Sequence, residues 1–243
     1  MAAKKPASKK ENLSKSALRR QREREQRYET ILRAAETLFA REGFHKASME
    51  QIADAAEVSV GAVYFYFKNK EDLLIRMTDE IGYTLRAILG REFKAHGATM
   101  EGFKRAGYAF FEDFCINYPA QAAIVFRESV GKSAEVEAHR KALFDKCTND
   151  VLNALNTVCE NQGVSFKGRF SAEVIAVSIM GIYERVAYHY LLWQDKGEDL
   201  KDIGRDAVEF IVGGVNNLFE DPSASGALDP LAEKRKSESE GKR

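Results

Sequence analysis

SMEQIADAAEVSVGAVYFYFKNK, residues 48–70, is the stretch that decides the fold. Ser48 followed three residues later by Gln51 forms the capping-box pattern that begins a helix, and Ser59 is of the type that begins a second one. Asn69 can cap a third helix that begins at Lys70. Two helices as short as the first two bury little apolar surface alone. The stretch therefore predicts two short helices joined by a tight turn, packed on a partner helix.

The second of these helices, residues 60–67, has an unusual composition for a core element. Gly61 and Ala62 leave part of its surface nearly bare, so another backbone can approach it closely. Side chains suited to phosphate oxygens follow at once: Tyr64, Tyr66, Lys68 and Lys70. The pattern favours a helix-turn-helix whose second helix enters the major groove of DNA. The alternative is a small helical corner with two solvated lysines.

Residues 28–74 resemble the DNA-binding domain of the TetR family of bacterial transcriptional regulators. The matching residues are Ile31, Leu32, Ala34, Ala35, Leu38, Phe39, Gly43, Phe44, Ser48, Met49, Ile52, Ala53, Ala56, Val58, Ser59, Gly61, Tyr64, Tyr66, Phe67, Lys70, Glu71 and Leu73. They lie in about a fifth of the chain. The resemblance implies an all-α fold of about nine helices, with an N-terminal three-helix helix-turn-helix domain and a C-terminal helical domain for ligand binding and dimerisation.

The residue pattern and the resemblance together predict which residues bind double-stranded DNA. The full predicted set is Arg24, Arg27, Ser48, Met49, Ser59, Val60, Gly61, Ala62, Tyr64, Phe65, Tyr66, Lys68 and Lys70. Phosphate contacts are implied for Ser48, Tyr64, Tyr66 and Lys70, and base contacts for Met49, Val60, Gly61 and Ala62. None of the base-reading side chains is a good hydrogen-bonding group, although Val60, Ala62 and Phe65 can contact thymine methyls. We therefore expect DNA shape and a basic arm to carry much of the specificity.

The basic arm stands out in the charge distribution. The whole chain has a net charge of zero, but residues 1–27 contain ten Lys or Arg and three Glu. We expect residues 1–18 to be disordered and Arg19 to Arg27 to lead into the first helix. This segment is either a solvated helix start or an arm that lies along DNA phosphates or in the minor groove.

Beyond residue 70 the apolar residues recur at helical spacing and no strand pattern is present. The expected domains are a helix-turn-helix domain at 19–70, a ligand-binding and dimerisation domain at 71–220 and a disordered tail at 221–243. Helices are expected at about 70–93, 100–117, 119–131, 133–162, 171–194 and 198–219, with Ser133 and Ser171 as caps. The last two helices match the pair that forms the homodimer interface in the resembled family. The alternative is that they complete a monomer core.

An apolar cavity between the helices that follow residue 70 would hold an effector. Its candidate walls are Phe110, Phe111, Phe114, Phe126, Phe144, Cys147, Met180 and Tyr183, with Arg127 beside an anionic ligand head. Each of these residues can equally belong to an ordinary core. The resemblance implies a small hydrophobic effector, such as an acyl-CoA or an aromatic molecule, that releases DNA by a population shift.

Several function classes lack their residue patterns. The three cysteines are widely spaced, which is typical of reduced thiols in a cytoplasm, and the four histidines do not cluster into a metal site. There is no nucleophile–base set and no apolar run long enough for a membrane span, so we expect no enzyme, no cofactor and no membrane partner. The predicted function is a repressor that binds a palindromic operator as a dimer. The alternative is an architectural DNA-binding protein with little sequence specificity.

Overall fold

The computed structural model describes residues 15–220. The predicted tail at 221–243 and the first 14 residues of the predicted arm lie outside the described residues. Residues 15–18, which we expected to be disordered, are helical, because α1 begins at Lys15. The expectation of a disordered arm is therefore wrong for these four residues.

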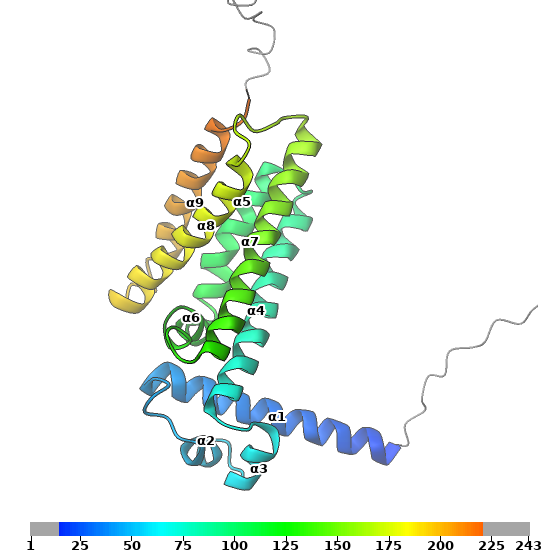
Figure 1. Cartoon of the computed structure of the whole chain (residues 1–243), viewed down its shortest axis with the longest axis vertical. Helices are drawn as coiled ribbons and strands as arrows, with labels where there is room; N and C mark the ends of the chain where they lie inside the picture. Colours follow the sequence, from blue (N-terminus) through cyan, green and yellow to red (C-terminus); the bar gives the residue numbers. More distant parts are fainter. Residues whose placement is uncertain (1–14, 221–243) are drawn as a thin grey trace, which may run out of the picture. The chain divides into compact units, whose positions relative to one another are not determined.

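Nine α-helices make up most of the described residues (Figure 1). They are α1 (Lys15–Glu42), α2 (Met49–Ala55), α3 (Val60–Tyr66), α4 (Lys70–Ala95), α5 (Met100–Ala109), α6 (Pro119–Ala123), α7 (Ala134–Gln162), α8 (Ser171–Ala187) and α9 (Leu200–Asn217). The part of the chain that the structure describes contains no strand beyond one isolated bridge between Phe166 and Phe219. The predicted all-α fold is confirmed. Across residues 15–220, no helix combines the length and apolar content that crossing a membrane requires.

The chain divides into two compact units, and the boundary between Met77 and Thr78 falls inside α4. In the first unit, α1 packs on α2 and α2 packs on α3, and Ile31, Ile52 and Val63 are fully inaccessible to solvent. α1 is thus the partner helix that the two short helices need.

The predicted caps of the first unit are present. The Ser48 hydroxyl accepts a hydrogen bond from the Gln51 amide at 3.2 Å, and the Gln51 side chain accepts one from the Ser48 amide at 2.8 Å. Ser59 caps α3 through the Ala62 amide at 3.2 Å, and Asn69 caps α4 through the Asp72 amide at 2.8 Å. These caps satisfy backbone donors that the first turn of each helix would otherwise leave open.

The second unit is a bundle of long helices (Figure 1). α7 and α9 both pack on α8, and α5 packs on α9. Phe111, Phe114 and Leu155 are fully buried at the centre of this bundle.

The second unit has one feature that the sequence did not predict and one that differs from expectation. Three π-helical segments, Phe110–Cys115, Ile124–Glu128 and Tyr188–Trp193, continue α5, α6 and α8. In addition, Ser171 does not cap α8, because Phe170 occupies the N-cap position and no side chain makes a capping hydrogen bond there. Ser133, by contrast, caps α7 as expected.

Candidate nucleic-acid interface and effector pocket

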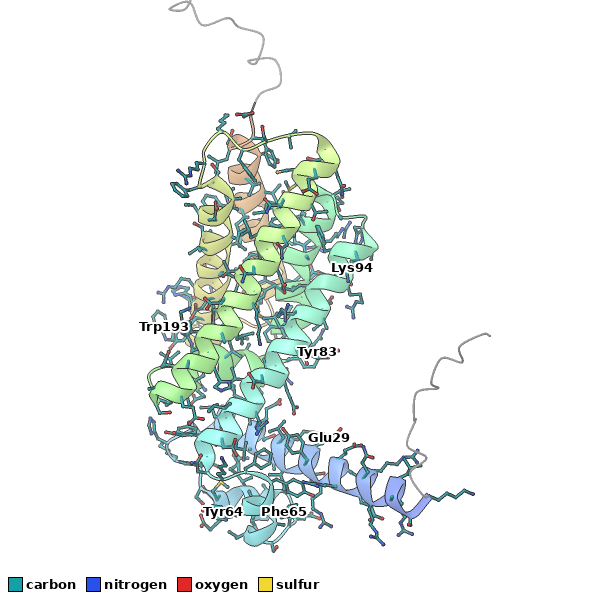
Figure 2. The ribbon with its side chains drawn as sticks, turned by 45° about the vertical axis from the view of Figure 1, so that its right-hand side comes forward. Glu29, Tyr64, Phe65, Tyr83, Lys94 and Trp193 are labelled. Carbon is teal, nitrogen blue, oxygen red and sulfur yellow. The ribbon has the colours of Figure 1, made fainter. Side chains whose placement is uncertain are left out.

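The outer surface of α3 is the most open apolar surface of the first unit. Val63 is the only residue of this helix that is buried, so the remainder of the helix faces outward. Tyr64 is 50% and Phe65 is 68% exposed, and Figure 2 shows both at the surface of α3. A Cβ atom added to Gly61 would meet no atom within 4 Å. The helix therefore presents a bare patch beside two aromatic side chains.

Most of the predicted DNA-binding residues lie on this surface or beside it. Ser59, Val60, Gly61, Tyr64, Phe65 and Lys68 are exposed, Ser48, Ala62 and Tyr66 are half-buried, and Arg24 and Arg27 are exposed on α1. The ring of Tyr66 packs edge-on against Tyr28 with 6.3 Å between centroids.

Met49 does not fit its predicted role as a base reader. Its side chain is only 5% exposed, and it shares a helix face with Ile52 and Ala53, which are buried in the same core. The spacing of these three residues already favours a core position. The expectation is corrected on that ground.

Lys70 also differs from expectation. Its ammonium group donates hydrogen bonds to the carbonyl oxygens of Phe44 at 2.9 Å, His45 at 3.3 Å and Ala47 at 2.6 Å. It also lies 4.8 Å from the centre of the Phe44 ring. Because an ammonium has three N–H donors, the loop between α1 and α2 takes all of them. The predicted contact between this ammonium and a phosphate is therefore corrected, and the side chain ties the loop to the start of α4.

Ser48 lies beside a negative charge. The Glu50 backbone amide and then the Ser48 hydroxyl hydrogen-bond to the Glu50 carboxylate and hold the pKa of that carboxyl below its ordinary value. A phosphate at Ser48 would therefore meet an ionised carboxylate. This makes Ser48 a weaker phosphate partner than Tyr64 or Lys68.

A cavity of about 560 Å³ lies within the second unit, between α4, α5, α7 and α8. This volume is in the usual range for small-molecule sites. Its apolar wall includes Phe93, Phe103, Ile179 and several neighbouring residues, and its polar wall consists of Arg86, Lys94, Asp150, Asn153 and Thr157. Figure 2 labels Lys94 and Tyr83, two residues of α4 that line the cavity.

The cavity includes four of the nine predicted ligand residues: Phe110, Cys147, Met180 and Tyr183. The other five lie outside its lining. Phe111, Phe114 and Phe126 are core residues at most 4% exposed. Arg127 pairs with Glu128 at 2.6 Å, and Phe144 lies under the Arg140 guanidinium at 4.6 Å. The structure places these five residues outside this cavity, and their role in ligand binding stays a prediction.

Residues of α4 and α7 that the sequence analysis did not single out contribute much of the lining. Arg86 binds Asp150 through two hydrogen bonds, of 2.5 and 2.9 Å, which join the two helices at the cavity wall. Ala87, Gly90 and Ala154 also line the cavity, and their small side chains leave the space that the bulky apolar residues fill elsewhere. The sequence signal that could have revealed this part of the lining is the presence of small residues on two helices that face each other.

The titratable groups of the apolar wall are uncharged at neutral pH. Burial, with a smaller contribution from the Asp150 charge, raises the pKa of the Cys147 thiol to about 11. Burial likewise raises the pKa of the Tyr183 hydroxyl. The wall therefore offers apolar groups and neutral dipoles, while charge is confined to the Arg86–Asp150 pair and Lys94.

Comparison with known proteins gives a consistent result. Residues 31–77 match the family model described as bacterial regulatory proteins, tetR family. The HTH-type transcriptional activator FasR of Mycolicibacterium smegmatis is 25% identical over 195 residues, which cover 80% of this chain and 85% of that protein. The fatty acid metabolism regulator protein of Bacillus subtilis is 22% identical over 193 residues, covering 79% and 96%.

Solved structures show the same fold. The fatty acid degradation regulator FadR from Bacillus halodurans has a TM-score of 0.68 at 23% identity, covering 77% of this chain and 95% of that chain. FadR from Bacillus subtilis, solved in complex with stearoyl-CoA, has a TM-score of 0.66 at 21% identity, covering 77% and 98%.

Proposed function

Because the chain belongs to the TetR family of bacterial transcriptional regulators, we propose that it is a dimeric, effector-responsive regulator that binds operator DNA through α3. The observation that carries the proposal is the open surface of α3 around Gly61, flanked by Tyr64 and Phe65. Such a surface lets the helix backbone approach the floor of a major groove while the tyrosine hydroxyl and Lys68 reach phosphates.

The dimer is proposed from the outer faces of α8 and α9. Val174 and Val177 on α8 are 60% and 62% exposed, and Phe210 on α9 is 74% exposed. A Cβ added to Gly181, Gly213 or Gly214 would meet nothing within 4 Å, so these faces are both apolar and open. A monomer rarely exposes such a surface without a partner. A second copy, related by a two-fold axis, would cover it and would present two reading heads to a palindrome.

The effector is proposed to be a long-chain acyl-CoA. The fatty acid regulators among the relatives and the stearoyl-CoA complex of one of them support this class. The chain's own cavity suits an amphiphile, because an apolar wall for a hydrocarbon chain adjoins Lys94 and the Arg86–Asp150 pair. Binding that favours one arrangement of the dimer would change its affinity for DNA by a population shift.

The proposed direction of control is repression that the effector relieves. Activation is the second candidate, because a relative that spans most of this chain is named an activator. A promoter reporter carrying the operator, compared in strains with and without the gene, decides between the two. Reporter activity that rises on deletion supports repression, and activity that falls supports activation.

The DNA-binding proposal is tested by selecting genomic fragments that the purified protein retains. The dissociation constants of a selected operator and a scrambled duplex are then compared at fixed salt. A regulator is expected to prefer the operator by about a thousandfold or more. A ratio near one supports the architectural alternative, which the shortage of polar base-reading side chains on α3 favours.

The effector proposal is tested with palmitoyl-CoA in the same assay. We expect it to raise the operator dissociation constant of the wild type at least tenfold. Gly90→Leu should abolish this response, because Gly90 lines the cavity and has open space beside it. Ala142→Leu, at an exposed position of α7, is the matched control and should respond normally. An equal response of Gly90→Leu and the control would contradict the proposed site.

A further inference from the structure

The first turns of α1 carry a stripe of arginines on one face of the helix. Arg20, Arg24 and Arg27 are spaced by four and three residues, so they lie one above another. The same spacing continues to Ile31 and Ala35, which are fully buried against α2 and α3. The stripe is therefore an extension of the face of α1 that packs on the helix-turn-helix. We call these three residues the arginine stripe.

Ring contacts bring the arginine stripe next to α3. Tyr28 stacks on Phe67, with 5.1 Å between ring centroids. One turn earlier, the guanidinium of Arg24 lies 5.4 Å from the centre of the Phe65 ring. A guanidinium over an aromatic face is held there by a cation–π attraction. The first turns of α1 run on past α2 and α3 in both views (Figures 1 and 2).

Several other charges of α1 are paired. Arg19 pairs with Glu23 at 2.8 Å and Arg33 with Glu29 at 2.9 Å. Within residues 15–220, by contrast, no carboxylate pairs with any residue of the arginine stripe. The two glutamates nearest to the stripe in sequence have other partners: Glu23 pairs with Arg19, and Glu25 accepts a hydrogen bond from Gln21. Positive charge without an ion pair is thus present on the side of α1 that α3 occupies.

We propose that the arginine stripe is a second DNA contact, which binds backbone phosphates that flank the base pairs read by α3. The inference rests on the proposed function. Seven helical residues span about 10 Å along the axis, which matches about three base-pair steps of duplex. The helical form of the segment excludes insertion into the minor groove, because a helix about 10 Å wide does not fit a groove about 6 Å wide. The contact is therefore with phosphates.

The stripe is tested by comparing two triple variants of the full chain. Arg20→Gln, Arg24→Gln and Arg27→Gln together remove the stripe, whereas Arg19→Gln, Arg22→Gln and Arg33→Gln remove the same charge from other faces of α1. The measurement is the operator dissociation constant across a salt series. Log affinity falls with log salt, and each lost phosphate contact makes this fall less steep by about 0.9. We expect the stripe variant to lose between two and three units of slope per head and the control variant less than one.

Three further readouts make the result decisive. Helical circular dichroism should be equal in both variants and the wild type. Replacing the stripe by Arg20→Lys, Arg24→Lys and Arg27→Lys should keep most of the slope. Equal loss of slope in the stripe and control variants, or no loss in the stripe variant, would overturn the inference while leaving the wild-type operator preference intact. A wild type without operator preference would instead overturn the proposed function and the inference with it.

Discussion

At the scale of single residues, two lysines that are alike in sequence have different roles. Lys68 and Lys70 both follow the aromatic residues of α3, and spacing alone suggests the same contact with phosphate for both. In the structure Lys68 is exposed, whereas the Lys70 ammonium is bound to three carbonyl oxygens of the loop that follows α1. The difference depends on the position of that loop relative to the start of α4. A local pattern in the sequence does not predict this position.

Exchanging each lysine for methionine should therefore give opposite results. Lys70→Met removes the three hydrogen bonds from the ammonium to the loop and is expected to lower the free energy of unfolding by about 2 kcal/mol. Lys68→Met should leave stability unchanged and lower the salt slope of operator binding by about 0.9 per head. Urea denaturation and the salt series measure the two effects. An unchanged stability of Lys70→Met would show that the loop does not need this ammonium.

Cys147 allows a pH-dependent prediction. Its pKa in the folded chain is about 11, and an unfolded thiol titrates near 8.5. Because the folded pKa is raised, this group stabilises the fold fully below about pH 8.5 and loses that contribution as the pH rises towards 11. Between pH 8 and 11, we expect the wild type to lose about 2–3 kcal/mol more stability than Cys147→Ala. Denaturation curves at the two pH values check this. An equal loss of stability in the wild type and in Cys147→Ala would contradict the burial of this thiol.

At the scale of elements, most helix boundaries and caps could be predicted, and the π-helical segments could not. The caps at Ser48, Ser59 and Ser133 follow from bonds within four residues, so a local reading suffices. The π-helical segment that contains Phe111 cannot be predicted from such local bonds, because it depends on packing across the bundle. A Cβ at Gly204 on α9 would lie 2.4 Å from the Phe111 ring, so the two helices meet at this glycine. Such a contact between distant residues has no local signature.

The proposed interface of α8 and α9 gives the prediction at this scale. Phe210→Glu places a charge at the centre of an exposed apolar face and should convert the dimer to a monomer at micromolar concentration. Val130→Glu, which replaces a residue 44% exposed outside α8 and α9, is the control and should remain dimeric. Sedimentation velocity measures the change, and operator affinity should fall with the dimer. A Phe210→Glu variant that remains dimeric would show that the interface does not lie on this face of α9.

At the scale of the whole molecule, the family and the exposed surface of α3 could be predicted, whereas only part of the cavity lining could. The resemblance depended on residues close together in the chain, and the match to residues 31–77 covers the same stretch. The cavity depends on α4 and α7, where Gly90 and Ala154 leave space, whereas most of its predicted walls were large aromatic side chains. Phe111 and Phe114 are buried in the core, because large apolar residues fill space more often than they surround it.

The central claim is that the bare surface of α3 exists to lie against DNA, and Gly61→Leu tests it most directly. A Cβ atom at position 61 would meet nothing within 4 Å, and leucine is a better helix former than glycine by almost 1 kcal/mol. The melting temperature should therefore stay the same or rise. The operator dissociation constant, measured on the same preparation, should increase at least a hundredfold. Operator binding at wild-type affinity by this stable variant would contradict the account.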